Sequence, residues 1–539
     1  TYFNMSDGTM AANNTTQNDS RGGGVWAAKS AAGGDIVINL EGGSKIAGNN
    51  SKDKVGGKRN SDLYVGEDST RTMINVTGDL DSCTIINLYA PYDIVKDKIG
   101  EVTTGGTIQN ISNIRRFGSP ALLATQSQSG TDVIWGTYEG FIRVTYNGNN
   151  IGYYSTLPQA FNAIEQSTET QYEFVIYIMK SSFTVYTPCV VPGGKKIRMT
   201  TDLDEIQGPA TLYKGAPGLE ILRLSNPNTD LTIGNVMLDV NGETLTGDTA
   251  SLIYVDSNAT GSTITLQNKT GSSPSPIYPV LKNSVTREYI DSTGQPYFPK
   301  GGAICMETGQ LIMNTGTITD NTLISHIEPP SQSIGNKGAG IYLTGDASVI
   351  MNGGTISNNN AGTEESQFAQ SFGGGVFVGS HPASGPAFQM NGGTISGNNA
   401  LLGGGIYASS NEEGGAQVEI NGGVIANNTA KEMGGAVFSV GNTEVYSPDS
   451  YAHLDLAGGR IVNNSTTEGE GGGGVLYAGD KAVSIKDAPA TGATHLNISD
   501  NYSYGELSNL EYISWGDDCF FDVASQLSED VNVGVSIGY

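Results

Sequence analysis

Residues 388–400 read Phe-Gln-Met-Asn-Gly-Gly-Thr-Ile-Ser-Gly-Asn-Asn-Ala, and this stretch decides the fold. Apolar and polar residues alternate in Phe388–Met390 and again in Thr394–Ser396, which is the two-residue period of β-strands. Related stretches recur along the chain, with the matching isoleucine at positions 318, 356, 395, 425, 461 and 498. The spacings of 38, 39, 30, 36 and 37 residues indicate a repeat protein.

A glycine-rich step into a third strand recurs with the same period. It occurs at Gly301–Ile304, Gly338–Tyr342, Gly373–Phe377, Gly403–Tyr407, Gly434–Phe438 and Gly472–Leu476. One period therefore contains three short strands, here Val376–Val378 and the two strands quoted above. Three strands per period, with spacers of variable length, are typical of one turn of a coil. The sequence predicts an all-β fold, a right-handed parallel β-helix: a solenoid with three strands per turn.

Stacked turns bring equivalent residues of successive repeats into contact, so the six isoleucines are expected to form an aliphatic stack inside the coil. Asparagine amides are expected to stack at one corner and to bond to each other or to backbone, at Asn359, Asn398, Asn427 and Asn463. The length variation predicts edge loops at 320–337, 360–372, 379–386, 409–416, 441–452 and 478–493.

The same pattern opens the chain, as in Gly22-Gly23-Gly24-Val25-Trp26, and aligning Ile46 with Ile498 gives an outer period of about 450 residues. We expect residues 1–145 to be the C-terminal turns and tail of a first β-helix module. Residues 186–539 are then a second module with its C-terminal strands, and the sequence is expected to be a fragment of a tandem array.

A short linker, residues 146–185, separates the two modules and contains a predicted helix. Thr156 followed three residues later by Gln159 forms a capping box, and Phe161 and Ile164 lie on one face of the helix. This helix is expected to cap the open end of the second coil. Early strands of that coil are predicted at Phe174–Met179, Cys189–Val191, Lys196–Met199, Leu219–Leu224, Leu231–Val240, Leu252–Val255 and Ser262–Leu266.

Composition limits the function classes. The 539 residues include 75 glycines without the three-residue period of collagen, and the 37% hydrophobic content argues against disorder. The formal charge of −26 repels polyanions at long range, so no nucleic-acid partner is expected. No run of 18 apolar residues is present, which predicts no membrane insertion.

The cysteines lie more than a hundred residues apart and lack metal-ligand spacing, so we expect buried, unpaired thiols at Cys83, Cys189, Cys305 and Cys519. No metal site and no cofactor are predicted. Calcium in the loops is compatible with the negative charge, but the sequence assigns no ligands to it.

The Gly-Gly-Ala-Ile motif at Gly301–Ile304 and the Phe-x-x-Asn motif at Phe388–Asn391 resemble the repeats of polymorphic outer-membrane-protein-type passengers. The fuller pattern, Met-Asn-Gly-Gly-Thr-Ile-Ser-Gly-Asn-Asn-Ala followed by Gly-Gly-Gly-Ile-Tyr, is similar to large right-handed β-helix adhesin-like surface proteins of gut Firmicutes. The resemblance covers most of residues 1–60 and 190–539. It implies the same fold and an extracellular location on a bacterial cell surface.

Repetition favours an adhesin or stalk-like protein, because a spacer or a multivalent binder gains from copying its unit. Such a protein would bind host or environmental glycans or proteins through its edge loops. Its expected partners are host or microbial surface glycans or glycoproteins, together with neighbouring β-helix modules of the same chain. The candidate ligand-binding residues are His326, Tyr446 and Tyr451.

The alternative hypothesis is a carbohydrate-active enzyme, a glycoside hydrolase or polysaccharide lyase with an acidic site on the β-helix groove. Glycosidases need two carboxylates about 5–10 Å apart, which stacked turns are able to supply. The candidate catalytic residues are Glu328, Glu364 and Glu365; Asp517, Asp518 and Asp522 are weaker candidates. A lyase would also need a basic residue, and no repeat-borne Lys or Arg cluster is present, so binding without catalysis is favoured.

Overall fold

The computed structural model describes residues 141–533 in atomic detail, with gaps, and only the strand positions before and after them. The gaps are 204–205, 207, 241–244, 246, 269–278, 291–293, 327–333, 363–369, 381, 383–384, 410–414, 441–451, 469–470, 479–482, 487–494, 514–520 and 524–530; side chains 477, 512–513 and 521–523 are also outside the description. Most of the predicted edge loops overlap these gaps.

The chain divides into two compact units, Thr1–Glu139 and Gly140–Tyr539. In the first unit three strands pair in parallel, namely β1 (Tyr2–Met5), β4 (Ile36–Gly42) and β9 (Thr72–Leu80). Shorter strands β2 (Thr9–Met10), β5 (Lys45–Ile46) and β10 (Ile85–Tyr89) also pair in parallel. Its other strands are β3 (Val25–Ala27), β6 (Asn50–Lys52), β7 (Lys58–Asn60), β8 (Leu63–Val65), β11 (Lys98–Glu101), β12 (Ile114–Phe117), β13 (Leu122–Gln126) and β14 (Asp132–Thr137).

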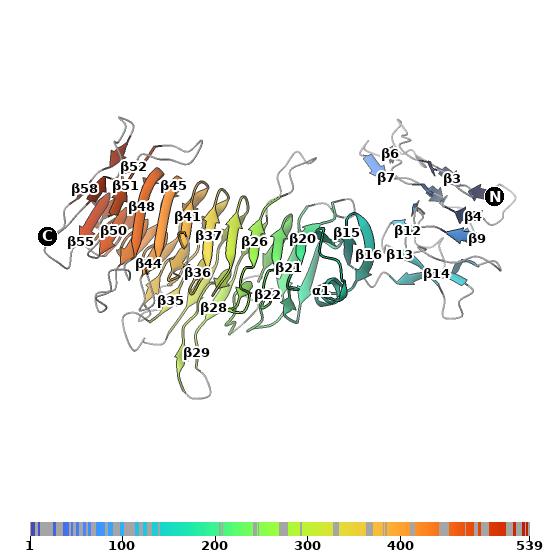
Figure 1. Ribbon diagram of the computed structural model, residues 1–539, viewed down its shortest axis with the longest axis horizontal. Helices are drawn as coiled ribbons and strands as arrows, with labels where there is room; N and C mark the ends of the chain where they lie inside the picture. The colour runs from blue at the N-terminus through green and yellow to red at the C-terminus, as the bar shows by residue number, and fades with distance from the viewer. Residues whose placement is uncertain are drawn as a thin grey trace. The chain divides into compact units, whose positions relative to one another are not determined.

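The second unit is mostly β, and its long parallel sheets run along one direction (Figure 1). The largest sheet takes two strands from each turn. The first series is β17 (Phe174–Ile178), β20 (Lys196–Thr201), β23 (Asp230–Ile233), β26 (Thr263–Leu266), β32 (Gln310–Met313), β37 (Ser348–Met351), β41 (Phe388–Met390), β45 (Gln417–Ala426), β48 (His453–Val462), β51 (Val483–Ile485) and β56 (Phe521–Val523).

The second series lies beside the first: β18 (Ser182–Val185), β21 (Ala210–Lys214), β24 (Val236–Asp239), β27 (Val280–Lys282), β33 (Thr317–Thr319), β38 (Thr355–Ser357), β42 (Thr394–Ser396), β52 (Asn497–Ser499) and β57 (Asn532–Val533). The long strands β45 and β48 contribute to both series. Two strands per turn therefore belong to one sheet, and the chain returns to it with the period read from the sequence.

A second parallel sheet carries the strand that follows each glycine-rich step: β19 (Cys189–Val190), β22 (Leu222–Leu224), β25 (Ile253–Val255), β31 (Ile304–Met306), β36 (Ile341–Leu343), β40 (Val376–Val378), β44 (Ile406–Ser409), β47 (Val437–Val440), β50 (Val475–Ala478), β55 (Leu510–Ile513) and β58 (Val535–Ser536). The three strands predicted for the central period coincide with β40, β41 and β42. The fold is therefore all-β and solenoid-like, with a single helix among the described residues.

A fourth short strand completes the later turns, and the sequence pattern did not predict it. These strands are β35 (Asn336–Lys337), β39 (Ser371–Phe372), β43 (Asn399–Leu402), β46 (Thr429–Met433), β49 (Ser465–Thr466) and β53 (Tyr502–Ser503), with β54 (Glu506–Leu507) antiparallel to the last. They are only two to five residues long and lie in the segments of variable length, where no periodic signal repeats.

The predicted isoleucine stack is confirmed. Ile356 pairs with Ile318 on one side and with Ile395 on the other, and the register continues through Ile425 to Ile461. These side chains are at most 1% exposed. Burial of this aliphatic column, together with its neighbours from both sheets, supplies the hydrophobic stabilisation of the coil.

The predicted asparagine stack is confirmed at Asn359 and Asn398 but is wrong by one residue in the next two turns. There the buried residues are Asn428 and Asn464, whereas Asn427 and Asn463 have a φ of +57°. The first residue of each pair occupies the left-handed region, which asparagine tolerates, and the second turns its amide inward. The complete series is Asn321, Asn359, Asn398, Asn428, Asn464 and Asn501.

Successive glycines of each step have different roles. Gly373 has a φ of +66°, so it supplies the left-handed corner that the sequence predicts. Gly374 has no such φ, but a Cβ there would lie 2.5 Å from the carbonyl oxygen of Gly404 on the next turn. Close stacking of the turns therefore explains why more than one glycine is needed.

The single long strand predicted at Leu231–Val240 is wrong. Two strands replace it, β23 and β24, which Gly234 and Asn235 separate. The Gly234 N–H donates to the carbonyl oxygen of Met199 on the preceding turn at 2.9 Å, so the chain turns here as it does at the Gly-Gly pairs of later repeats. The Gly234-Asn235 dipeptide, which lies between two apolar stretches, marks this corner in the sequence.

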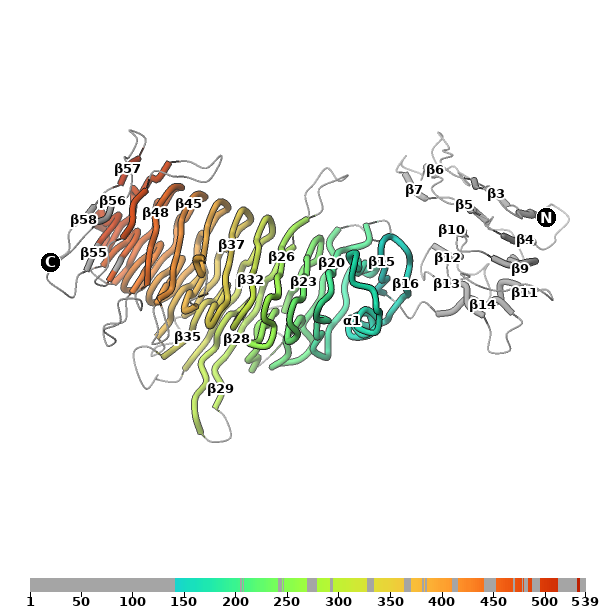
Figure 2. Tube along the Cα trace, in the orientation of Figure 1, coloured from blue at the N-terminus to red at the C-terminus, as the bar shows by residue number. Residues whose placement is uncertain are grey.

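The first end of the second unit is closed by the predicted helix and by a hairpin that was not predicted. Helix α1 (Leu157–Gln166) has Thr156 as its N-cap, whose side chain accepts from the Gln159 N–H. Strands β15 (Ile142–Tyr146) and β16 (Asn149–Tyr154) form an antiparallel hairpin, and β15 also pairs with β17. Helix α1 lies at this end of the coil (Figure 2). Its Phe161 side chain is buried in the core.

Within the described part of the chain, α1 is the only helix, and no helix has the length and apolar character needed to cross a membrane.

Candidate ligand-binding site

A β-hairpin projects sideways from the stacked turns of the second unit (Figures 1 and 2). It leaves the coil after β28 (Val285–Arg287), which pairs in parallel with β34 (Thr322–Ile324), and consists of β29 (Tyr289–Ile290) and β30 (Pro296–Tyr297). Among the described repeats one other short antiparallel hairpin occurs, β53 with β54, so this element is one of two places where a hairpin interrupts the repetition.

Two tyrosines face each other across this hairpin. Tyr289 and Tyr297 are direct cross-strand partners, their ring centroids are 4.9 Å apart, and the ring planes differ by only 5°. The two side chains are 45% and 47% exposed, and the neighbouring Ile290 is 62% exposed. Aromatic cross-strand pairs stabilise a hairpin, and here the pair also forms a flat apolar surface in solvent.

Local sequence explains the shape of the hairpin. Gly294 has a φ of +84°, which the return of the chain requires and which other residues rarely adopt. Pro296 cannot donate a backbone hydrogen bond, a loss that an edge strand tolerates. Phe298 directly follows and is buried, so it anchors the second strand to the coil while Tyr297 stays outside.

His326 lies at the base of this hairpin, beside Glu288, the residue that precedes Tyr289. Its backbone N–H donates to Glu288 Oε1 at 3.0 Å, and its Nδ1 is 3.3 Å from the same oxygen. The imidazole is exposed, whereas Glu288 Oε2 is buried and has no hydrogen-bond partner among the described residues. The hairpin thus carries an exposed aromatic face, and the exposed imidazole of His326 at its base is the polar group that a ligand can reach.

Of the three predicted ligand-binding residues, the structure describes His326, which contacts Glu288, the residue before the first tyrosine of the exposed pair. Tyr446 and Tyr451 lie outside the described residues, as do Glu328, Glu364 and Glu365 and the weaker candidates Asp517 and Asp518; the side chain of Asp522 is also outside the description. Tyr289 and Tyr297 were missed because they lie in an insertion that no other repeat matches. Their signal was a Gly-Gln-Pro turn between two tyrosines.

A second group of polar residues follows the outer face of the large sheet. Glu419 on β45 and Asp455 on β48 are partners in register, and the Nε2 atom of Gln417 lies 3.3 Å from a Glu419 oxygen and 3.5 Å from Asp455 Oδ2. His453 Nε2 and Lys486 Nζ lie 3.3 and 3.1 Å from Asp455 Oδ1. The signal for this pair was the alignment of two repeats, in which both acids occupy the same position.

Asp455 of this pair is not suited to be the proton donor of glycoside cleavage. Burial raises the pKa of the Asp455 carboxyl, but hydrogen bonding and charge from His453, with hydrogen bonds from Lys486 and Ser484, outweigh burial and hold that pKa well below its usual range. Asp455 is therefore ionised at neutral pH. A glycosidase acid instead needs a raised pKa to remain protonated.

Outward-facing aromatic residues on the second sheet form a column that is covered. Tyr342, Phe377 and Tyr407 stack with ring centroids 5.2 and 5.4 Å apart, and they are at most 8% exposed. Phe372 packs against them from β39, and Lys337 Nζ lies 5.0 Å from the Phe377 ring centroid. Burial and the charge of Lys300 lower the pKa of Lys337 to about 8. These rings pack the turns together and offer no face to a ligand.

Cys189 and Cys305 are free and buried, as predicted, whereas Cys83 and Cys519 lie outside the description. Burial raises the pKa of both described thiols to about 12, so they are unreactive as thiolates. Among the described residues, no three His, Cys, Asp or Glu side chains gather as a metal site would require.

Comparison of the chain with protein-family models, with curated proteins and with solved structures gave no match.

Proposed function

We propose that this chain is part of a bacterial cell-surface adhesin or stalk-like protein that binds glycans or glycoproteins through elements projecting from its coil. Its turns would form a right-handed parallel β-helix, with three principal strands per turn. The parallel register of equivalent strands from turn to turn supports that description.

The observation that carries the proposal is the exposed, parallel stack of Tyr289 and Tyr297 on the projecting hairpin. Large apolar side chains are costly to leave in water, and an exposed aromatic surface next to polar groups is typical of a binding site. The outer face of such a ring accepts the C–H face of a pyranose. The exposed imidazole of His326, held by Glu288, would then bind sugar hydroxyl groups beside it.

The coil would serve this site as a rigid support. Each turn contacts its neighbours through the isoleucine and asparagine stacks, so stability extends along the coil without a central globular core. Neighbouring β-helix modules of the same chain would add length and further copies of the site. Copies on one rod raise the apparent affinity for a surface that presents many identical sugars.

Glycan-array binding tests the proposal, with a hydrolysis assay on mucin and plant polysaccharides in parallel. The Tyr289→Ala and Tyr297→Ala variants should lose binding while thermal unfolding changes little, because both rings are outside the core. Tyr186→Ala is the matched control, since this tyrosine is 70% exposed but does not belong to the hairpin. Binding that survives in both hairpin variants, or that is lost equally in the control, would contradict the site.

The alternative function, a carbohydrate-active enzyme with its acids on the sheet groove, is favoured by one observation, the register of Glu419 with Asp455. Stacked parallel strands are about 4.8 Å apart, which brings two carboxylates to a glycosidase separation. Release of sugar by the wild type, abolished by Glu419→Gln, would establish this function instead of simple binding.

A further inference from the structure

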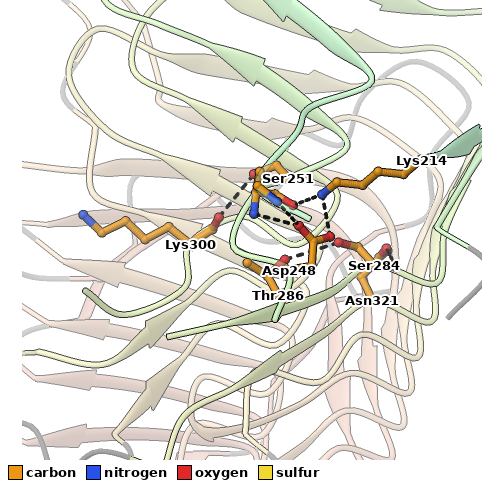
Figure 3. A network of polar contacts seen from close by, with 9 residues as sticks. Lys214, Asp248, Ser251, Ser284, Thr286, Lys300 and Asn321 are labelled. Atoms are coloured by element: carbon orange, nitrogen blue, oxygen red, sulfur yellow. Dashed lines mark hydrogen bonds and ion pairs between the residues drawn. The ribbon is translucent and has the colours of Figure 1, made fainter. Parts of the chain in front are cut away.

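An ion pair without solvent contact lies inside the coil where aliphatic residues are expected. Lys214 ends β21, whose alternate residues Ala210, Leu212 and Lys214 are buried, so the lysine follows the inward series. Its Nζ atom is 2.5 Å from Asp248 Oδ2, and both side chains are 0% exposed (Figure 3). The two residues are 34 positions apart in the chain.

The surrounding backbone holds the Asp248 carboxylate in a defined orientation. Its Oδ1 atom accepts from the Gly218 N–H at 3.0 Å and from the Ala250 N–H at 3.2 Å. Two backbone N–H groups on one oxygen are the arrangement that stabilises a developing oxyanion in acyl transfer. The other oxygen, Oδ2, faces the lysine amine, which also donates to the Ala250 carbonyl at 2.5 Å.

Burial also favours the neutral amine that a reaction between these groups requires. It lowers the pKa of Lys214, although the Asp248 charge and hydrogen bond and the charge of Glu220 oppose the shift. Removing two charges from water is costly, and moving one proton along the Nζ to Oδ2 contact gives a neutral amine beside a neutral carboxylic acid. The amine then adjoins the carboxyl group that it would attack, and the two backbone N–H groups already contact Oδ1.

We propose that Lys214 and Asp248 form an intramolecular isopeptide bond. Lys214 Nζ forms a bond to Asp248 Cγ, the atom bonded to Oδ2, while the two backbone N–H groups hold the negative charge on Oδ1. The Cγ–Oδ2 bond then breaks, and a proton from Nζ leaves with Oδ2 as water. An ammonium and a carboxylate become one amide and one water molecule, with no oxidant and no cofactor.

The bond would cross-link two segments that belong to neighbouring turns near the capped end of the coil. A covalent link of this kind constrains the unfolded chain as a disulfide does. Unlike a disulfide it does not depend on the redox state of the surroundings. The inference stands apart from glycan binding, because it concerns residues in the coil interior.

Intact-mass spectrometry of the full 539-residue chain under denaturing conditions tests the proposal. The wild type should be lighter than its sequence by one water molecule. Lys214→Met and Asp248→Ala should each have the full mass of their sequences, whether or not they fold. Lys431→Met is the matched control, because Lys431 pairs with Glu468 in an exposed ion pair, and this variant should keep the loss of one water.

Peptide mapping gives the second readout: a branched peptide should join the segments that contain Lys214 and Asp248. A wild-type mass equal to that of the sequence would overturn the proposal, since it would show an ion pair only. A loss of water that persists in both Lys214→Met and Asp248→Ala would overturn it equally, because the modification would then lie elsewhere.

Discussion

The side-chain amide of Asn398 donates to Oδ1 of Asn428 over 2.9 Å, and this contact repeats on every later turn of the coil through Asn501. Asn398 Oδ1 in turn accepts from both the side chain and the backbone N–H of Asn359, at 2.9 and 3.0 Å. The Oδ1 atom of each asparagine therefore accepts from a buried backbone N–H of the preceding turn. Its own side-chain N–H group donates to the asparagine of the next turn. The stack connects the turns by a continuous series of polar contacts.

Replacing one buried rung should be much more destabilising than replacing an exposed one. Asn398→Leu leaves two donors of Asn359 without an acceptor, and an unsatisfied buried group costs about 1–3 kcal/mol. We expect the free energy of unfolding to fall by about 2–5 kcal/mol. The control is Asn391→Leu, whose exposed amide donates to Asn352 Oδ1 at 2.9 Å. Urea unfolding measures both, and equal losses would contradict a special role for the buried series.

Asp455 should make stability depend on acidic pH. Its folded-state pKa is lower than the unfolded value of about 3.9, so the ionised carboxylate stabilises the fold above that pH. The contribution is lost as the pH falls through the folded pKa. Asp455→Asn should cost about 1–3 kcal/mol at pH 7, and the difference from wild type should shrink below about pH 4. Urea midpoints across this range test it; a difference that does not change with pH would contradict the assignment.

The cap at the first end of the coil should contribute measurably to stability. Phe161 is 2% exposed, and Phe161→Ala is expected to cost about 3–5 kcal/mol because it leaves a cavity under α1. Thr156→Ala removes only the N-cap contact to the Gln159 N–H and should cost about 1 kcal/mol. Thermal unfolding compares the two variants. An equal effect would mean that the helix does not cover the core.

Much of the coil could be predicted because its repeats constrain the same position six times. The isoleucine column and the strands around Ile395 follow from alternation alone, whichever turn is considered. The prediction of which asparagine is buried failed in later turns because Asn427 and Asn428 are the same residue type. Only the backbone φ distinguishes the corner residue from the buried one. The prediction of a single strand at Leu231–Val240 failed because the Gly234-Asn235 corner between its two apolar stretches was included in the strand.

The candidate sites were harder to predict because they are where repetition ends. Tyr289 and Tyr297 lie in an insertion that the repeat pattern does not include. Their pairing depends on the register of this hairpin, which the repeat alignment does not predict. Lys214 and Asp248 come from early, degenerate turns, and nothing in their local sequence indicates that they meet. His326 was predicted from its loop and its chemistry, but its partner Glu288 follows from the pairing of β28 with β34.

The coil should tolerate the removal of one complete turn. Deleting residues 392–421 removes one repeat of 30 residues and joins Asn391 to Gly422, so the later residues keep their phase and Ser357 should pair directly with Ala426. In the full chain Ser396 lies between them, and adjacent parallel strands are about 4.8 Å apart, a spacing that permits a disulfide. Ser357→Cys with Ala426→Cys should therefore form a disulfide in the deletion variant and not in the full chain, as read by mass after alkylation. A cross-link in the full chain, or none in a folded deletion variant, would show that turns are not the independent units of this protein.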